Sequence, residues 1–497
     1  MEDILMKPGK IVPYFLLISL CIGLIMRGYQ IKERFLYTHD NDLSSWIIKD
    51  IIIDGHPRLI GQLTSAPGIF IGPLFYYSLI PFYLLGGMDP AAGLYLSLLI
   101  GLSTIISIYF IMTRLHSETA GKITSLVYAS SELISRTERE VVPTTPVMLW
   151  SIWCYYGVNL VFKGDKKGFI IAAVLFSLVW HINLALILLA PLFIIGFFYQ
   201  IRKFKFTDLI LPLIIFLTLS SPLIFFEARH GLVQSKALVG SLLSAGDKSA
   251  GITLPQKISH VISYALKNAN HIFLDNGSQN NLWILPTLLI ISFSLLILLR
   301  KIPLYEGPIF LVWMGLFIAF FTFHPINLSE YYLNGMNIFW IIILGLVLSA
   351  FYNNSRLRLI SLAVLTFIMT ANLSSFLVSP INASGYFERK SIVDYIEIDA
   401  KAHNYPCISI SYITNPGYQL GYRYLFYLKG MHVNQPISGS PVYTIVYPHP
   451  LVDRLDKTFG ALGLILPDYD RYSPGAVKLS CTGANSNLTD PMFGFTR

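Results

Sequence analysis

Residues 38–90 read THDNDLSSWIIKDIIIDGHPRLIGQLTSAPGIFIGPLFYYSLIPFYLLGGMDP, and this stretch decides how the rest of the chain is interpreted. It begins with a cluster of polar and acidic residues and ends in an apolar, aromatic-rich run that contains Pro73 and Pro81. One apolar run precedes it at 11–27 and another follows it at 91–112. A helix needs ~17–20 apolar residues to cross a bilayer. We therefore expect the acidic cluster at a membrane–water boundary.

The composition of the whole chain fits a membrane protein. Of 497 residues, 13% are charged and 54% are hydrophobic, and the mean hydropathy is +0.59. Soluble domains carry ~25% charged residues, so a soluble protein of this size could not cover its core with so few. The same figures exclude a disordered chain, a disulfide scaffold and a nucleic-acid-binding protein.

Apolar stretches recur along the first three quarters of the sequence. We distinguish twelve of them, at 11–27, 69–86, 91–112, 122–135, 143–162, 168–181, 183–200, 207–226, 282–299, 308–323, 331–350 and 359–378. They predict an α-helical polytopic membrane protein with about 11–13 transmembrane helices. The run at 11–27 is followed by basic residues and lacks a small-residue cleavage pattern, so it is expected to be an uncleaved first helix.

Basic residues between the stretches predict the orientation. They gather before the first stretch and after the fifth, seventh, ninth and eleventh, and the positive-inside rule places all of these loops in the cytoplasm. The start of the chain and residue 163 cannot both be inside if all five intervening stretches cross. One early stretch must therefore be re-entrant, interfacial or split, and 69–86 and 122–135 are the candidates.

The sequence predicts two domains, a membrane domain over 1–379 and an extracytoplasmic α/β domain over 380–497. In the second, 389–403 and 420–430 have helical spacing, whereas 407–413 and 442–448 alternate as strands. Cys407 and Cys481 both fall in this part and could pair in an oxidising compartment.

The acidic cluster of the first outer segment is the first candidate site. Asp40 and Asp42 lie close to His39, and neighbouring carboxylates raise one another's pKa, which suits a general base. Asp42 could instead cap the helix expected over SSWIIKDIII. His56 and Arg58 follow on the same loop, either as solvated charges or as part of an anion-binding site.

Other polar residues lie at outer helix ends. The fourth stretch ends in SRTERE (135–140), which is either a solvated face or a place for a phosphate or a divalent metal opposite the acidic loop. Arg139 in this motif, and Arg229 with His230 after the eighth stretch, are candidates for binding a phosphate. The last candidates are His181 and Glu330, which lie in two outer turns. A purely structural role is the alternative for both.

The order of these features resembles the GT-C glycosyltransferases, in particular the bacterial family related to protein O-mannosyltransferases and the lipid A aminoarabinose transferase. The shared features are one helix, an acidic outer loop, the GPLFYY helix start (72–77), many further helices and an outer α/β tail. The resemblance covers most of the chain. It is strongest at 38–90 and at SSPLIFFEARHGLVQSKALV (220–239), and it is weak in the tail.

The resemblance implies an activity. Members transfer a sugar from a polyprenyl-phosphate donor to a hydroxyl of a lipid, glycan or protein outside the cytoplasmic membrane, and a single displacement would invert the anomeric centre. The base of the family corresponds to Asp40. The second acid of the family is usually adjacent, whereas here Asn41 follows and the carboxylate is displaced to Asp42. Relatives often have a basic residue where this chain has Gly72.

The resemblance leaves some partners and alternatives open. Membrane lipids and a polyprenyl-phosphate-linked donor are the expected partners, nucleic acid is not, and a divalent metal is the cofactor compatible with the acidic loop. Two other classes fit the same helices: a flippase or transporter of polyprenyl-linked glycans, and a non-catalytic membrane scaffold. A flippase would not need the acidic loop or a large outer tail.

Overall fold

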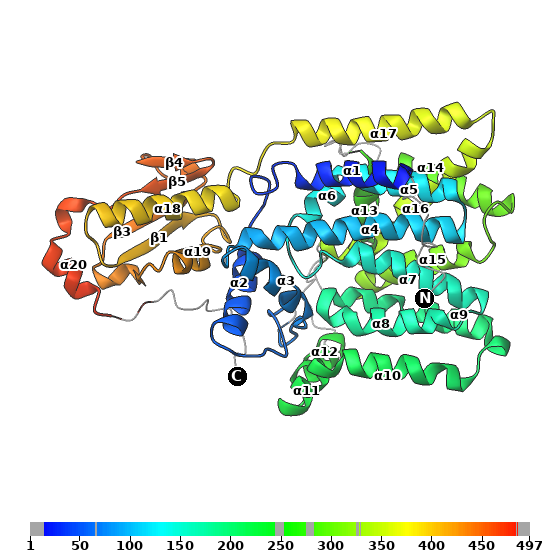
Figure 1. The fold of residues 1–497 in the computed structure, drawn as a ribbon, viewed down its shortest axis with the longest axis horizontal. Coiled ribbons are helices and arrows are strands. Elements are labelled where there is room, and N and C mark those ends of the chain that lie inside the picture. The colour runs from blue at the N-terminus through cyan, green and yellow to red at the C-terminus, as the bar shows by residue number, and fades with distance from the viewer. Residues whose placement is uncertain are drawn as a thin grey trace.

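The computed structural model describes residues 14–64, 67–243, 253–274, 283–324, 328, 330–483 and 485. Long helices run side by side in a bundle, and a small β-sheet with its own helices lies at one end of that bundle (Figure 1). The loops that follow α9 (Ala190–Tyr199) and α16 (Asn334–Asn353) lie at the opposite end. This is the predicted polytopic helical fold with a small C-terminal sheet domain.

The bundle contains most of the helices. Their bounds, besides α9 and α16, are α1 (Tyr14–Gly28), α4 (Gly93–Leu115), α5 (Glu118–Ser130), α6 (Glu132–Glu138), α7 (Val147–Lys163), α8 (Lys167–Ile182), α10 (Ile210–Leu219), α13 (Leu254–Phe273), α14 (Ile284–Leu298), α15 (Glu306–Phe323) and α17 (Arg358–Val378). Short helices at the sheet end of the bundle are α2 (His39–Ile52), α3 (Leu74–Leu85), α11 (Ser221–Arg229) and α12 (Val233–Leu243).

Helix α16 is the centre of the bundle. It packs against α5, α7, α14 and α17, and 83% of its apolar window is buried by other helices. Lipid cannot drive apolar helices together, so packing has to hold them, and small residues let helices approach closely. Gly345 shows this, because a Cβ there would overlap the Thr124 side chain of α5.

The structure offers one answer to the mismatch among the early stretches. The run at 69–86 forms only the 12-residue helix α3, with Pro81 inside it. At 1.5 Å per residue this helix is about 18 Å long, against roughly 30 Å of bilayer hydrocarbon. The run at 122–135 forms α5 and α6, which meet at Ser131. If 69–86 does not cross, the start of the chain and residue 163 can lie on the same side.

Fewer helices are long and apolar enough to cross a membrane than the sequence predicts. Within the described residues, four helices are long and apolar enough to cross, and a bent pair, Phe206–Leu219 with Ser221–Arg229, brings the number to five. Shorter apolar helices add to these, namely Tyr14–Gly28, Leu74–Leu85, Lys167–Ile182, Leu184–Tyr199 and Ile284–Leu298. The number 11–13 therefore stays a prediction.

The C-terminal part is built around a five-stranded sheet with the order β2-β1-β3-β5-β4. Strand β1 (Ile408–Thr414) pairs in parallel with β2 (Val433–Asn434) and β3 (Val442–Tyr447), whereas β5 (Leu462–Ile465) is antiparallel to β3 and β4 (Lys457–Phe459). Three helices accompany the sheet: α18 (Tyr386–Ala402), α19 (Arg423–Leu428) and α20 (Pro474–Ser480). The predicted elements α18, β1, α19 and β3 are confirmed, and the three short strands were not predicted.

The sheet does not have a hydrophobic core of its own. Its buried side chains belong to the same cluster as those of α2 and α3, so that Trp46 packs edge-on against Tyr424 and Phe35 lies against Tyr386. The bundle helices form a separate cluster. The proposed domain boundary at 379 stays a prediction, because this shared core joins segments from both sides of it.

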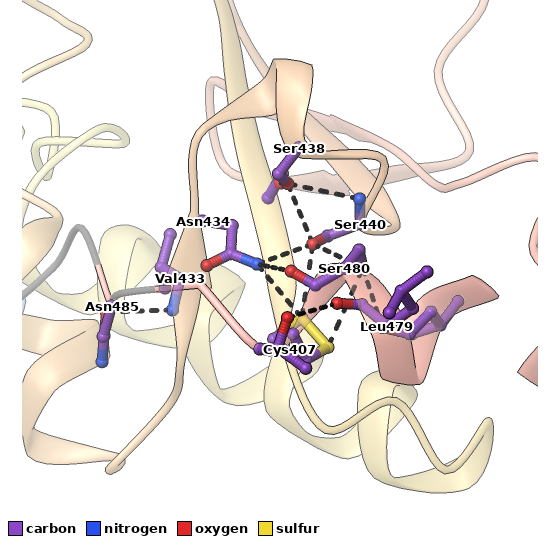
Figure 2. The surroundings of a disulfide bond; sticks show 12 residues. Cys407, Val433, Asn434, Ser438, Ser440, Leu479, Ser480 and Asn485 are labelled. Carbon is purple, nitrogen blue, oxygen red and sulfur yellow. Dashed lines mark hydrogen bonds between the residues drawn. A yellow bond between two sulfur atoms is a disulfide. The ribbon is translucent and has the colours of Figure 1, made fainter. Parts of the chain in front are cut away.

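Cys407 and Cys481 form a disulfide, with Cα atoms 5.5 Å apart. It joins the start of β1 to the end of α20, and Figure 2 shows it among the polar side chains of Asn434, Ser440 and Ser480. The Asn434 amide donates to the Ser440 hydroxyl at 2.8 Å and to the Ser480 carbonyl at 3.0 Å. The other two cysteines, Cys21 and Cys154, are free.

The disulfide should stabilise the tail measurably. It spans 74 residues of sequence, and closing a loop of that length lowers the entropy of the unfolded chain by an amount equivalent to about 4 kcal/mol. We expect the double variant Cys407→Ser/Cys481→Ser to melt at a lower temperature than wild type. Thiol titration of the unreduced, denatured wild-type protein should find two thiols, and a finding of four would contradict the pairing.

Candidate active site at the start of helix α2

The start of helix α2 is fixed against the loop that follows α6. Asn41 accepts a hydrogen bond from the Thr38 backbone N–H at 2.7 Å, which satisfies a donor at the start of the helix. Its amide group donates to the carbonyl oxygens of Glu140 at 2.7 Å and Val141 at 3.0 Å. Asp40 therefore stands in the first turn of α2, beside residues 140–141.

Asp40 is exposed but lies close to protein on several sides. One carboxylate oxygen accepts a hydrogen bond from the Gln62 side-chain amide at 3.1 Å. Desolvation raises the pKa of Asp40, while nearby His39 and the bond from Gln62 lower it. A carboxylate that is accessible, desolvated and held in place can act as a general base.

Glu140 is the second carboxylate of this cluster. Burial raises its pKa to about 7, the charge of Asp40 adds to that rise, and Arg136 opposes it. Arg136 is half-exposed and its guanidinium lies 3.4 Å from a carboxylate oxygen of Glu132. The cluster thus combines two facing acids with a cation that solvent can reach.

Gln62 is positioned by a close contact between two segments. Its backbone N–H donates to the Tyr76 hydroxyl at 3.2 Å. The Tyr76 ring passes over Gly61, where a Cβ would overlap the ring atoms. Residue 61, directly before Gln62, is a glycine. Because it has no side chain, Tyr76 from α3 can reach the loop.

Asp42, the second predicted catalytic acid, is buried. It is 0% exposed, and one of its oxygens accepts bonds from the Tyr37 hydroxyl at 3.0 Å and the Tyr424 backbone N–H at 3.2 Å. It does not cap α2, since Thr38 precedes the first helical residue. In this position Asp42 ties α2 to the tail and is closed to a substrate.

His56 and Arg58 converge on Asp50 rather than on Asp40. The His56 ring nitrogen lies 2.9 Å from one carboxylate oxygen and an Arg58 nitrogen 3.5 Å from the other. Arg58 is 3% exposed in its side chain, and burial lowers its pKa despite Asp50. Its guanidinium is therefore part of the interior of the outer segment.

A set of metal-ligating side chains lies in the same place. Asp50, Asp54 and His56 have ligand atoms within 4.8 Å of one another. Lys49 already contacts the Asp54 carboxylate at 2.6 Å and Arg58 contacts Asp50. A divalent cation at this set would have to compete with both basic groups.

Arg139 faces into the bundle. Its guanidinium donates to the Met26 carbonyl at 2.6 Å, and it lines a cavity of about 10 Å³ with Arg27 and Glu138. A water molecule needs about that much space, so a phosphate does not fit there. Arg27 and Glu138 form a buried ion pair at 2.5 Å across α1 and α6.

His181 has a structural contact at the start of α3. Its Nδ1 accepts from the Leu74 backbone N–H at 3.2 Å, and the ring lies where a Cβ of residue 72 would be. Gly72 therefore stands where relatives often have a basic residue because the His181 ring occupies that space.

The remaining predicted residues lie around α11. Arg229 is exposed at the end of that helix. His230 stacks on Phe226 with ring centres 4.2 Å apart, and its Nδ1 lies 2.9 Å from the Phe226 carbonyl. Glu330 begins a short helix, Glu330–Leu333, and its side chain lies outside the described part of the chain.

An apolar groove of about 390 Å³ opens between α7 and α8. Its lining is entirely hydrophobic: Pro146, Leu149, Trp150, Trp153, Ile170, Ile171, Val174, Leu175, Leu178 and Ile182. Two of these residues lie at helix ends, Pro146 just before α7 and Ile182 at the end of α8. Along the chain they come soon after Glu140 and His181. Such a groove suits a hydrocarbon chain.

The structure therefore brings together some of the predicted residues and adds others. Asp40 is joined by Glu140, Gln62 and Arg136, which the sequence analysis did not select. Glu140 and Arg136 belong to the quoted SRTERE motif, but the spacing along the chain could not show that Asn41 would hold this motif against α2. Gln62 carried no motif at all.

Comparisons with known proteins bear on the fold. Residues 71–193 match the family model described as dolichyl-phosphate-mannose-protein mannosyltransferase. No curated protein matches the chain. Among solved structures, ArnT from Cupriavidus metallidurans bound to undecaprenyl phosphate has a TM-score of 0.58 at 10% identity, over 93% of this chain and 98% of that one. The apo form of the same protein gives 0.55 at 11% identity over the same shares.

These matches show the fold of the chain. It is the fold of ArnT, and residues 71–193 also match a mannosyltransferase family model. The GT-C resemblance that the sequence predicts is confirmed at the level of the fold.

The raised pKa of Glu140 has a consequence for stability. Its pKa is about 7 in the folded protein against 4.5 for an ordinary Glu, so the folded state holds a proton that the unfolded chain releases between these pH values. Stability from this group is present at pH 4.5 and is lost as the pH rises to about 7. We expect Glu140→Gln to raise the melting temperature at pH 8 and to leave it unchanged at pH 4.5.

The control for this experiment is Glu33→Gln, which removes an exposed carboxyl of the same outer segment. Equal melting temperatures of wild type and Glu140→Gln at pH 8 would show that the Glu140 carboxylate is not desolvated.

Proposed function

We propose that the protein transfers a sugar from a polyprenyl-phosphate donor to a hydroxyl acceptor at the outer face of the membrane, with inversion at the anomeric carbon and with Asp40 as the base. The observation that carries the proposal is the placement of Asp40: accessible, desolvated and held by Gln62 beside a second acid. The GT-C fold supports the reaction class.

The reaction would proceed in one displacement. The acceptor oxygen forms a bond to C1 of the sugar while the bond from C1 to the phosphate oxygen breaks. The acceptor proton passes to the Asp40 carboxylate, and the electron pair leaves with the polyprenyl phosphate. Because the leaving group gains negative charge, its stabilisation is the larger electrostatic task.

Arg136 is the cation best placed for that task. It is the half-exposed basic residue whose charge acts on Glu140, and Glu140 in turn acts on Asp40. Arg58 and Arg139, by contrast, are both buried and bonded to protein groups. A guanidinium binds phosphate oxygens in a bidentate geometry, which adds orientation to charge.

A divalent cation fits the same cluster. Burial raises the pKa of both Asp40 and Glu140, so ionising the two carboxyl groups is costly, and a bound cation would offset that cost. Asp40 and Glu140 would hold the ion, and it would supply positive charge to the leaving phosphate.

The groove between α7 and α8 suits the lipid part of the donor. It holds about 390 Å³ and is lined only by hydrophobic side chains. A lipid chain that already lies in the bilayer gains little hydrophobic free energy in this groove, so the groove would hold and orient it through packing contacts. This groove is apolar along its whole lining, so it would hold the lipid part of the donor and not the sugar.

The orientation follows from the basic loops. Lys163, Lys166 and Lys167 lie between α7 and α8, and the loops after α9 and α16 lie at the bundle end remote from the sheet (Figure 1). By the positive-inside rule that end is cytoplasmic, so the sheet and Asp40 lie outside the cytoplasm.

Reporter fusions test this orientation. Fusions after residues 165, 260, 355 and 450 should read inside, outside, inside and outside, because α8 to α10, α14 to α16 and α17 separate these positions. An inside reading at 450 would contradict the placement of the tail.

Replacement of Asp40 tests the chemistry. Asp40→Asn keeps the size and the hydrogen bond with Gln62 but cannot take a proton, so transfer should fall by about 10²–10⁴-fold. The measurement is transfer of labelled sugar from polyprenyl-phosphate donors in membranes that contain the full-length protein. Without added divalent cation the variant should still bind the donor, since Asp40 is itself an anion and adds no attraction to the phosphate.

Two further variants serve as controls for Asp40→Asn. Asp54→Asn removes an exposed carboxylate of the same segment that Lys49 neutralises, and it should transfer at close to the wild-type rate. Asp42→Asn should lower the melting temperature through lost contacts to Tyr37 and Tyr424. Wild-type transfer by Asp40→Asn would rule out Asp40 as the base.

A further inference from the structure

The backbone of Val141 has a left-handed conformation, with a φ of 52°. A β-branched residue rarely adopts this conformation, and it persists only where the surrounding structure enforces it. Among the described residues other than glycine, Val141 is the β-branched one with such a φ. The residue before it is Glu140, on whose carboxyl group the charge of Asp40 acts. The strained backbone therefore lies directly beside the candidate site.

Val141 is held from two sides. Its side chain is 2% exposed, and its Cγ1 lies 2.7 Å from the place where a Cβ on Gly93 of α4 would stand. Its carbonyl oxygen accepts a hydrogen bond from the Asn41 amide at 3.0 Å, and the same amide group donates to the Glu140 carbonyl at 2.7 Å. The packing on α4 and the amide from α2 thus oppose the strain together.

Asn41 has its amide oxygen and its amide nitrogen in use. The side chain is 3% exposed, and its oxygen accepts hydrogen bonds from the Thr38 backbone N–H at 2.7 Å and the Thr38 hydroxyl at 3.2 Å. Its nitrogen makes the two bonds to the carbonyl oxygens of Glu140 and Val141. A carboxylate at this position could accept the first two bonds but could not donate the other two. The contact with residues 140–141 therefore depends on the amide.

The peptide between Glu140 and Val141 is the part that this amide controls. On the side of α6, the Glu140 backbone N–H donates to the Thr137 carbonyl at 3.2 Å, which ties Glu140 to the end of that helix but not to α2. Without the Asn41 amide, Val141 could return to a negative φ, and that change rotates the peptide that joins it to Glu140. A glycine at position 141 would have no such tendency, because glycine adopts positive and negative φ about equally well.

We infer that Asn41 and Val141 are positioning residues: the Asn41 amide restrains the strained backbone of Val141 and thereby keeps Glu140 in its place beside Asp40. The inference rests on the proposed function, in which Asp40 is the base and Glu140 the second acid of the site. Both positioning residues are buried and act through Glu140. The strain makes the restraint specific, since it is needed when residue 141 has a side chain and not when it is glycine.

Thiol labelling measures the position of residue 140 without any transfer reaction. Glu140→Cys is introduced into the full-length protein without its two free cysteines (Cys21→Ser/Cys154→Ser) and is labelled with a charged maleimide. We expect Asn41→Ala to speed labelling by about 10-fold, the factor that corresponds to the left-handed strain of one residue. In the Val141→Gly background, where that strain is absent, Asn41→Ala should speed labelling by less than about 3-fold.

The transfer assay applies the same comparison to the reaction. Asn41→Ala should lower kcat by about 10-fold in the otherwise wild-type protein and by less than about 3-fold in the Val141→Gly background. If Asn41 served only to stabilise the start of α2 through Thr38, its loss would lower kcat by the same factor in both backgrounds. Rescue by Val141→Gly therefore separates positioning from a purely structural role.

The control is Arg300→Gly, which places a glycine at an exposed left-handed residue between α14 and α15. It should leave the effect of Asn41→Ala on labelling and on kcat unchanged. Unaltered labelling in Asn41→Ala, an equal effect of that variant with and without Val141→Gly, or rescue of labelling without rescue of kcat would each overturn the inference. If labelling follows the expected pattern but the wild type transfers no sugar, the proposed function fails and the restraint on Glu140 does not.

Discussion

The buried carboxylate of Asp42 joins the parts of the molecule on which the site depends. Its contacts are the Tyr37 hydroxyl, five residues earlier, and the Tyr424 N–H in the tail. A buried charge that loses its partners costs several kcal/mol, so these three groups have to stay together. Asp40, two residues before Asp42, is thereby fixed in the first turn of α2, and Asn41 fixes that turn against Glu140.

This contact also explains why the tail shares a core with the outer segment. The side chains of α2 and α3 are hydrophobic on the face that does not meet the bundle, and they can be buried only against α18, α19 and the sheet. Lys390 and Tyr386 reinforce the contact through the Asp89 carboxylate, at 2.7 and 2.5 Å. Helix α19, which follows β1, packs on α2 and so joins the sheet to the helix that carries Asp40.

The sequence predicts the large features because they depend on composition. Few charges, long apolar runs and basic loops are sufficient for the helical fold, and alternation is sufficient for β1 and β3. It could not decide which early stretch fails to cross, since 69–86 is as apolar as a true span and only the structure shows that its helix α3 is 12 residues long. Asp42 and Glu140 show the same limit at the site. The sequence places Asp42 next to the other acidic residues and makes it a catalytic candidate, whereas the structure buries it. Glu140 lies far from this segment in the chain, and a hydrogen bond from Asn41, 99 residues away, brings it to the cluster.

The position of the acids at the end of the bundle follows from the energetics of charge in lipid. A carboxylate at mid-membrane is costly, and its pKa would rise until it could no longer accept a proton near neutral pH. Full exposure to water would give Asp40 the pKa of an ordinary Asp and make it too weak a base for a hydroxyl. A partly desolvated carboxylate near the end of the bundle avoids both limits. The raised pKa of Asp40 therefore follows from its place in the first turn of α2, where protein lies close to it without enclosing it.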